Sequence, residues 1–428
     1  MKWNLIELTG QLNLPSSFIR KICKHYKRVN KTPVVLLDMG VPALAISRHL
    51  GRRGIPIIAL DTKRKHWTHK SKYIYTLVST KLRSRNSLLD VLGSLALLFD
   101  ERPVLIPMHD DYVKFVASNR EVLGNTNRLV IPDESVAESI VDKSKLYELC
   151  LKHDIPVPAT IFSDNLDDLK QQATKIRFPC IIKPAESRAW QTEKAHKLLN
   201  GKKAVIAENK NELIEIFTML SVIEPRMVIQ DLVKGPDENL YYVVSYVDKR
   251  GDIRGNFVGQ KLRTYPAHYG RGSYVRSVLN ESAVKIATKI VKRLNYHGNI
   301  GVELKLDVID QQYKLIEINA RFGLWDGFSS DCDMDLVYTA YADAIGEEIK
   351  INDTYKLNKY WINFEIDYKA AIQYYRKGEL SIINWLDSVI TSDYSAITAR
   401  DDIKPALAFC ADTAKYLSSR MLSRLRLN

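Results

Sequence analysis

The sequence predicts an α/β domain with a parallel sheet, followed by a larger α+β region. Near the N-terminus, the apolar runs 34–37 and 55–61 flank a helical stretch at 43–50. Strands that are apolar throughout are typical of a parallel sheet covered on both faces. Farther along the chain, the alternation at 241–246 and the turn at 248–252 favour antiparallel strands joined by hairpins.

Changes in this pattern divide the chain into four expected segments. The first is a basic appendage, and the last is a Tyr- and Trp-rich extension whose elements the sequence does not assign. The parallel-sheet domain and the α+β region lie between them. The expected segments are residues 1–30, 31–131, 132–350 and 351–428.

Composition and charge narrow the function classes. The chain has 428 residues and a net charge of +13. Residues 1–90 contain 18 Lys and Arg residues against four acidic residues, so this part carries the whole positive excess and an anionic partner is expected. No recognisable RNA-binding motif accompanies the charge, so no nucleic-acid partner is expected. The five cysteines form no CxxC or Cys/His cluster, and no apolar run is long enough to span a membrane. We therefore expect a cytoplasmic protein.

Residues 16–29 predict an amphipathic helix that follows a Pro-Ser-Ser start signal. One interpretation is a short helix packed on the body of the protein. The other is an interfacial helix through which residues 1–30 contact an anionic membrane, on the inner membrane face. The apolar positions on one helical face are Phe18, Ile19, Ile22, Tyr26 and Val29.

Two lysines stand where an anion would be bound. Asp142 caps a predicted helix, and the helix start together with Lys143 in the first turn favours an anion there. Lys183 ends the apolar strand 178–184, where its charge needs an anionic partner or a shifted pKa. Taken singly, a solvated Lys143 and a Lys183 that reaches solvent explain the same pattern.

A third stretch joins the apolar strand 227–231 to a polar turn that ends near Asp237. Exposed backbone groups at such a turn can bind the edge of an adenine ring, and an acid several residues on can hold ribose hydroxyls. Alone, the pattern is more typical of an ordinary strand and turn.

A fourth stretch is a predicted hairpin around Asp310 that brings two acids together. Glu303 and Glu317 are 14 residues apart, which a hairpin can place side by side, and Asn319 shares a face with Glu317. Two carboxylates and an amide oxygen suit Mg²⁺ held partly by phosphates. A purely structural role would need a nearby cation, because unpaired acids are costly to bury. Arg321 continues the same face and suits a phosphate or a carboxylate.

In this order the four stretches resemble the ATP-grasp superfamily, and within it the carboxylate–amine ligases such as D-aspartate ligase and carbamoyl-phosphate-synthase-like proteins. The segments 260–266, 270–273 and 313–319 add to the resemblance, which spans roughly residues 33–350. It implies an ATP-grasp fold preceded by a parallel-sheet pre-ATP-grasp domain.

The resemblance also implies a role for each candidate residue. ATP would be the cofactor together with Mg²⁺ or Mn²⁺, and a mobile loop over residues 187–201 would cover the phosphates. The sequence departs from the family in two places, because this loop is not glycine-rich and Gln230 stands where many relatives have Glu. The implied nucleotide contacts are Lys143, Lys183, Gln230, Asp231, Leu232, Val233 and Asp237 or Glu238; the implied metal ligands are Glu303, Glu317 and Asn319; and the implied catalytic cations are Lys261, Arg263 and Arg321.

The activity that the resemblance implies is that of an ATP-dependent carboxylate–amine ligase. ATP would phosphorylate a substrate carboxylate, an amine would attack the acylphosphate, and phosphate would leave, so that no protein nucleophile is needed. The carboxylate would belong to an amino acid, another small molecule, or a glycan of a cell-envelope or surface-polysaccharide precursor. The alternative is an ATP-binding protein that has lost turnover.

Overall fold

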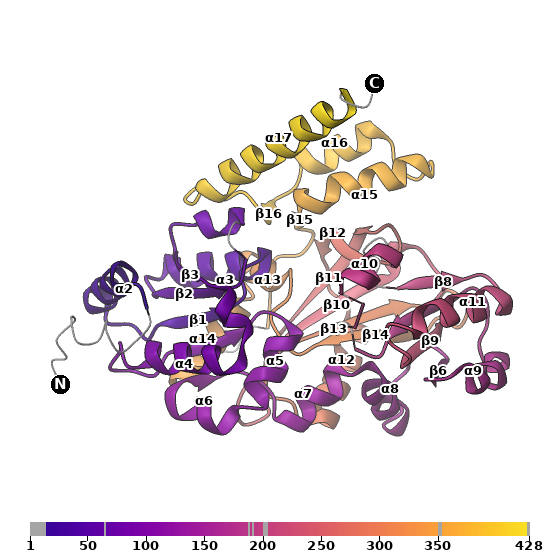
Figure 1. Ribbon diagram of the computed structural model, residues 1–428, viewed down its shortest axis with the longest axis horizontal. Coiled ribbons are helices and arrows are strands. Elements are labelled where there is room, and N and C mark those ends of the chain that lie inside the picture. Colours follow the sequence, from indigo (N-terminus) through magenta and orange to yellow (C-terminus); the bar gives the residue numbers. More distant parts are fainter. Residues whose placement is uncertain are drawn as a thin grey trace.

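The computed structural model describes residues 14–63, 66–186, 189–190, 192–199, 204–349 and 353–425. Figure 1 shows two β-rich regions side by side, with helices from the C-terminal part of the chain above them. The first region is α/β and the second is α+β, as the sequence predicts.

The N-terminal region is built on a parallel sheet of five strands in the order β3-β2-β1-β4-β5. β1 lies between β2 and β4, with Val34 opposite both Ile57 and Val104. β1, β2 and β4 are buried at every position, which explains why their sequences show no polar alternation. The strands are β1 (Val34–Leu37), β2 (Ile57–Asp61), β3 (Ile74–Val78), β4 (Val104–Pro107) and β5 (Arg128–Leu129). The helices are α3 (Val41–Arg52), η1 (Trp67–Lys70), η2 (Thr80–Arg83), α4 (Arg85–Ala96), α5 (Asp110–Ala117) and α6 (Arg120–Thr126).

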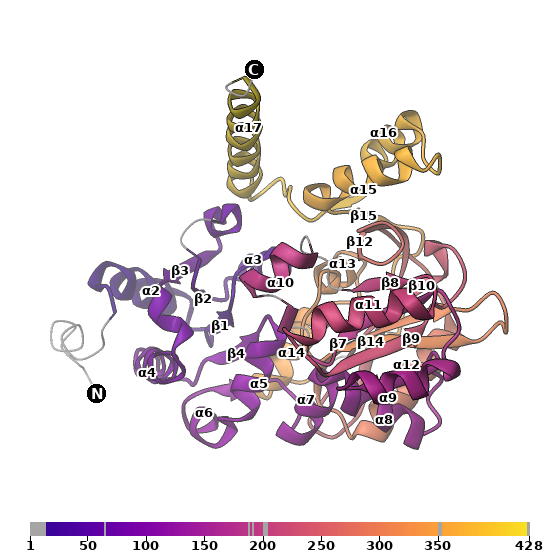
Figure 2. The same ribbon diagram turned by 45° about the vertical axis from the view of Figure 1, so that its right-hand side comes forward.

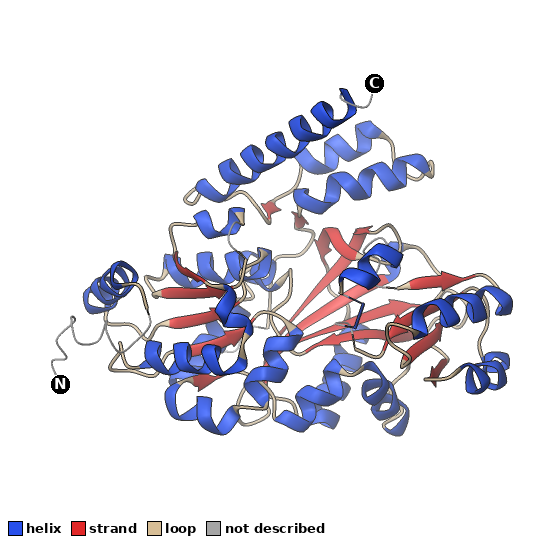
Figure 3. Cartoon of the chain, in the orientation of Figure 1, coloured by secondary structure: helices blue, strands red, loops and turns tan. Residues whose placement is uncertain are grey.

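The larger region contains two further sheets, drawn as red arrows in Figure 3. One has seven strands in the order β14-β13-β10-β11-β12-β15-β16, and only its β15–β16 pair is parallel among the described strands. The other has four antiparallel strands in the order β6-β9-β7-β8. The strands are β6 (Thr160–Ser163), β7 (Cys180–Pro184), β8 (Val205–Ala207), β9 (Met227–Asp231), β10 (Leu240–Val247), β11 (Ile253–Tyr265), β12 (Arg271–Ser277), β13 (Gly298–Leu306), β14 (Tyr313–Asn319), β15 (Tyr360–Ile362) and β16 (Tyr394–Ser395). The helices are α7 (Glu134–Val141), α8 (Lys143–Lys152), α9 (Leu166–Gln172), η3 (Ala173–Lys175), α10 (Glu193–Leu199), α11 (Lys210–Ser221), η5 (Asp237–Asn239), α12 (Glu281–Leu294), α13 (Asp326–Asp331) and α14 (Leu336–Ile345).

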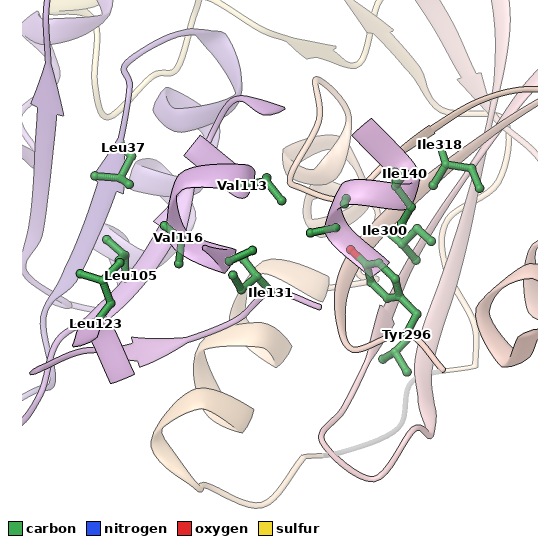
Figure 4. Packing of buried hydrophobic residues seen from close by; sticks show 14 of the residues in the cluster. Leu37, Leu105, Val113, Val116, Leu123, Ile131, Ile140, Tyr296, Ile300 and Ile318 are labelled. Atoms are coloured by element: carbon green, nitrogen blue, oxygen red, sulfur yellow. The ribbon is translucent and has the colours of Figure 1, made fainter. Parts of the chain in front are cut away.

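One continuous apolar cluster joins the two regions. In Figure 4, Leu37 and Leu105 of the parallel sheet lie on one side of this cluster, and Ile300 and Ile318 of the seven-stranded sheet lie on the other. Val113 of α5 belongs to the same cluster. Burial of this shared apolar surface holds the parallel sheet against the larger region.

Helix α2 (Ser16–Val29) packs on the body of the protein. Ile19, Ile22 and Tyr26 are buried in the main core cluster, and the Tyr26 and Phe99 ring centroids lie 5.1 Å apart. The structure therefore agrees with the first interpretation of this helix. Because its apolar face is covered by protein, the expected membrane contact through this face finds no support. Residues 1–13 of the predicted appendage lie outside the described residues. No described helix has the length and apolar character that a bilayer span requires.

The C-terminal segment, residues 353–425, contacts both regions of the protein (Figures 1 and 2). β15 extends the seven-stranded sheet next to β12, and β16 forms its edge. The remaining elements are helical, and the sequence alone did not assign them. The helices are α15 (Phe364–Arg376), α16 (Ile382–Ile390) and α17 (Lys404–Leu425).

Two buried ion pairs anchor this segment. Asp367 of α15 accepts hydrogen bonds from Arg263 Nε and Nη2, both at 3.0 Å, and from Ser273 Oγ at 2.8 Å. Asp402 binds Arg48 Nε of α3 at 3.1 Å in the N-terminal region. Because one segment carries both carboxylates, it ties the two regions to each other.

We expect Asp367→Asn to destabilise the folded protein by about 3–5 kcal/mol, because the change leaves Arg263 buried without a charged partner. Equilibrium urea unfolding followed by circular dichroism measures the free energy of unfolding. The matched control is Asp387→Asn on the exposed surface of α16, where a change of no more than about 0.5 kcal/mol is expected. Equal unfolding midpoints for the two variants would contradict a stabilising role for the Asp367 pair.

Candidate functional site

The candidate site is built on the hairpin β13–β14. Its register places Glu303 opposite Glu317 and Gly301 opposite Asn319. Residues directly opposite each other in an antiparallel pair point to the same face, so both carboxylates and the amide share one face of the sheet. A Cβ at Gly301 would lie 1.8 Å from the Tyr242 hydroxyl, so only glycine leaves room for this tyrosine on the same face.

Glu303 has a cation partner within the protein. Lys261 Nζ of β11 lies 2.8 Å from Glu303 Oε1, and the lysine side chain is only 3% exposed. The same ammonium lies 5.7 Å from the centroid of the Trp325 ring. This pair explains how an acid is tolerated on an otherwise apolar strand. It also means that a metal at Glu303 would compete with Lys261 for the carboxylate.

Arg321 connects this face to the parallel sheet. Its Nε donates to Asp110 Oδ1 at 2.6 Å, and its Nη2 donates to Asn319 Oδ1 at 3.0 Å. Burial raises the pKa of the Asp110 carboxyl, but the Arg321 guanidinium outweighs burial and holds that pKa below its usual value. The guanidinium thus bridges one polar side chain from each region.

Two lysines approach the same carboxylates from the smaller sheet and from α8. Lys183 Nζ of β7 donates to Gln230 Oε1 at 3.3 Å. Burial, and after it the charge of Lys143, lower the pKa of Lys183 to about 8 against the opposing influence of Glu317 and Glu303. These four charged groups therefore form one electrostatic cluster.

Helix α8 begins at Lys143, as the sequence predicts. The Asp142 side chain caps it by accepting from the backbone N–H groups of Ser144 and Lys145, at 2.9 and 3.2 Å. The backbone N–H of Lys143 donates to Ala185 O at 3.0 Å, one residue beyond β7. The helix start and the strand that carries Lys183 are therefore tied together.

A cavity lies where these elements meet. Its lining includes Lys143 and Tyr147 of α8, Glu317 of β14 and Asp110 of α5. The same cavity is therefore lined by a candidate phosphate-binding lysine, a candidate metal ligand and the acid that binds Arg321.

The predicted adenine-binding stretch lies where β9 ends. Gln230 has two partners, because its Oε1 accepts from Lys183 and its Nε2 donates to Thr160 Oγ1 at 3.0 Å. Leu232 is half-buried and Val233 is buried. An amide at position 230 therefore links the edge strand β6 to the phosphate-binding candidate on β7.

Two predicted contact residues are engaged elsewhere in the protein. The Asp231 carboxylate accepts from the backbone N–H of Arg177 at 2.7 Å and from its Nε at 2.6 Å. Arg263 is bound by Asp367 through two hydrogen bonds. The structure therefore gives both side chains a structural contact, and their direct roles toward nucleotide or phosphoryl group stay predictions.

The two acids proposed for the ribose differ in exposure. Asp237 is buried and accepts from Thr264 Oγ1 at 2.8 Å and from the Tyr374 hydroxyl, with His268 Nδ1 3.4 Å from its other oxygen. Glu238 is exposed. Of the two alternatives, Glu238 is the one whose carboxylate reaches solvent.

Sequence reasoning did not single out Lys305 or Asp110. Lys305 follows Glu303 by two residues on β13, so it shares the face of that acid and is buried there. Burial lowers its pKa, against the opposing charge of Asp237. Two features of the sequence could have identified them. Lys305 stands two positions after Glu303 on the same predicted strand, and Asp110 is an acid that shortly follows an apolar strand.

Part of the predicted phosphate-covering loop lies outside the described residues, namely 187, 188, 191 and 200–201. Within it, α10 forms a short helix, and Trp190 is buried in the core cluster of the four-stranded sheet. The covering role of this loop stays a prediction.

The oxygen donors suit a hard cation only when other ligands complete its shell. Among the residues that the structure describes, no group of three or more His, Cys, Asp and Glu side chains is placed to hold a metal. Glu303, Glu317 and Asn319 offer two carboxylates and an amide, which suits Mg²⁺ when phosphate oxygens and water fill the remaining positions. Metal binding at this face therefore stays a prediction that depends on bound nucleotide.

Comparison with known proteins confirms the fold and the resemblance. No protein-family model matches the chain. A D-aspartate ligase of Enterococcus faecium is 25% identical over 288 residues, which cover 64% of this chain and 67% of that protein. A Staphylococcus aureus N5-carboxyaminoimidazole synthetase solved with ADP superposes with a TM-score of 0.60 at 14% identity, over 77% of this chain and 80% of that chain. An L-amino acid ligase from Bacillus licheniformis superposes with a TM-score of 0.57 at 16% identity, over 74% of each chain. The predicted ATP-grasp fold with a preceding parallel-sheet domain is therefore confirmed.

The lowered pKa of Lys183 makes nucleotide affinity depend on pH in a predictable direction. If its ammonium holds phosphate, the dissociation constant of a non-hydrolysable ATP analogue should rise about tenfold per pH unit above pH 8, because the neutral amine cannot bind. Isothermal titration between pH 7 and pH 9 measures this. Lys183→Arg stays charged and should give a flat profile. The exposed control Lys292→Ala should follow the wild type, and a flat wild-type profile would refute the assignment.

Proposed function

We propose that this chain, which has the ATP-grasp fold, is an ATP-dependent ligase that joins a carboxylate to an amine. The observation that carries the proposal is the Glu303–Glu317 pair with Asn319 on one face of β13–β14, in one electrostatic cluster with Lys143 and Lys183. Cations beside oxygen ligands are what phosphoryl transfer requires.

We propose an amino acid as one of the two substrates. Two proteins similar to this chain are named as a D-aspartate ligase and an L-amino acid ligase, which supports this choice. The second substrate is a small molecule or a glycan from a cell-envelope or surface-polysaccharide precursor. The five cysteines are free, which suits a reaction in the reducing cytoplasm, where ATP is available.

In this proposal the nucleotide lies between the four-stranded sheet and β13–β14. Lys143 and Lys183 hold its phosphates, and the backbone of residues 230–233 meets the adenine edge. Glu238 binds the ribose, because Asp237 is already occupied by Thr264 and Tyr374.

The reaction proceeds in two steps. A carboxylate oxygen of the substrate attacks the γ-phosphorus of ATP, the bond to the β-phosphate oxygen breaks, and ADP leaves. The amine nitrogen then attacks the acyl carbon, the C–O bond to phosphate breaks, and the departing phosphate takes the amine proton. Exclusion of water protects the acylphosphate between the two steps.

Charge neutralisation is the contribution of the protein. A bound Mg²⁺ or Mn²⁺ would supply positive charge at the transferred phosphoryl group, with Glu303, Glu317 and Asn319 as its ligands. Lys261, whose ammonium lies 2.8 Å from Glu303, would supply a further positive charge beside the phosphates. Arg321, fixed by Asp110, orients the substrate carboxylate.

The alternative is a nucleotide-binding protein without turnover. One observation favours it. Lys261 Nζ already forms an ion pair with Glu303 Oε1 at 2.8 Å, and this ammonium would compete with a catalytic metal for the carboxylate. Measurement of ADP release with a panel of amino acids and sugar acids separates the two functions. Binding of ATP without ADP release under any substrate would support the alternative.

We expect Glu317→Gln to abolish Mg²⁺-dependent ADP release, because the amide keeps the size of the side chain but removes the negative charge that binds the metal. The fold should survive, and the melting temperature checks this. Glu215→Gln on the exposed face of α11 is the control and should retain wild-type turnover. Full activity in a folded Glu317→Gln variant would exclude Glu317 as a metal ligand.

A further inference from the structure

Much of the positive charge of the chain is concentrated after two strands of the parallel sheet. Residues 61–85 contain eight Lys and Arg residues and a single acid, Asp61, so this short stretch carries about half of the net charge of +13. The function proposed above uses none of these cations.

Three of them lie at the same edge of the sheet. β2 and β3 are parallel neighbours with Asp61 opposite Val78, so the residues that follow both strands emerge together. Lys63 follows β2, while Lys81 and Arg83 lie on η2 directly after β3. All three side chains are exposed. We call Lys63, Lys81 and Arg83 the basic edge.

The one acid in this stretch is buried and paired with a histidine. The Asp61 side chain is fully buried and accepts from the backbone N–H of Lys63 at 2.9 Å, and its other oxygen lies 2.7 Å from His69 Nε2. Within the described part of the chain, no carboxylate oxygen lies within 4.0 Å of the charged atoms of Lys63, Lys81 or Arg83. Lys63, Lys81 and Arg83 therefore have no ion-pair partner among the described residues, and the longer-range charge of Asp61 reaches Lys63.

The basic edge leads toward the candidate site along the carboxyl ends of the strands. The strand order reverses between β1 and β4, and in open α/β sheets ligands bind in the crevice at such a reversal. Asp110, directly after β4, binds Arg321 at 2.6 Å and lines the cavity of the candidate site. Three strand spacings separate β3 from β4, which is about 14 Å.

Tyr112 supports a connection between the basic edge and this crevice. Tyr112 lies on α5, two residues after Asp110, and is buried enough that desolvation raises the pKa of its hydroxyl to about 12. The acids Asp38 and Asp61 contribute to that rise, and the charge of Arg83 opposes it. The charges of Arg83 and of these acids therefore act on the same hydroxyl of α5.

We propose that the basic edge binds a phosphate or diphosphate group of one substrate of the ligation, whose reacting group reaches Arg321 through the crevice. The proposal rests on the ligase function proposed above. It assigns a substrate class, a phosphorylated acceptor long enough to reach from the basic edge to Arg321. Lysine and arginine together suit such a group, since both bind phosphate and arginine does so through two parallel hydrogen bonds.

The test uses inorganic pyrophosphate as the probe, with the nucleotide site saturated by a non-hydrolysable ATP analogue and Mg²⁺. Isothermal titration should show binding to the full-length protein that weakens as salt rises. The double variant Lys63→Ala/Arg83→Ala should lose at least tenfold in pyrophosphate affinity, while its affinity for the ATP analogue stays that of the wild type. The matched control is Lys24→Ala/Lys27→Ala, which removes the same charge from α2 and should bind pyrophosphate normally.

A second arm identifies the source of the phosphate. Phosphatidylglycerol vesicles that bind the wild type but not the basic-edge variant would assign the group to a lipid headgroup. Pyrophosphate binding without vesicle binding would assign it to a soluble substrate.

Two results would overturn the proposal. The first is that the wild type binds neither pyrophosphate nor anionic vesicles. The second is that the basic-edge and α2 variants lose the same amount of pyrophosphate affinity. Either result with intact binding of the ATP analogue would leave the ligase function standing, whereas loss of nucleotide binding in the wild type would remove that function itself.

Discussion

The arrangement of this protein depends on the ion pair between Arg321 and Asp110. The apolar cluster shared by the two regions supplies most of the favourable free energy of their contact, but burial of apolar surface has no preferred direction. A guanidinium held at 2.6 Å from one carboxylate does have a direction. Because Arg321 also donates to Asn319, the pair aligns the carboxyl end of the parallel sheet with the strand that carries Glu317. The cavity beside Asp110 consequently includes Glu317 in its lining.

The charged groups on that face form a balanced set before any ligand arrives. Lys261 is paired with Glu303, and Lys183 is held by an amide rather than by an acid. Burial lowers the pKa of Lys183, and an incoming polyanion would raise that pKa again and keep the lysine charged. Groups fixed in this way need little reorganisation during phosphoryl transfer, which is how preorganised sites stabilise developing charge.

Much of this arrangement could be predicted from the sequence, because it depends on periodicity and spacing. The apolar strands, the cap at Asp142 and the opposition of Glu303 and Glu317 follow from patterns that are local in the chain. The partners of Asp237 and Arg263 could not be predicted, since Tyr374 and Asp367 stand more than 100 residues away in a segment without a recognisable pattern. A sequence shows that an acid ends a strand. It does not show whether the carboxylate will be bound by solvent, by a ligand or by a side chain of a distant helix.

The position of Asp367 and Asp402 also constrains the order in which the chain can mature during synthesis. Their arginine partners, Arg48 and Arg263, are made much earlier and are both buried in the finished protein. Until the ribosome has produced the segment that contains Asp367 and Asp402, neither guanidinium has the carboxylate that allows its burial. Domains usually fold as units from the N-terminus onward. Here a later segment completes both earlier regions, so the nascent protein stays incompletely closed until Asp367 and Asp402 have been made.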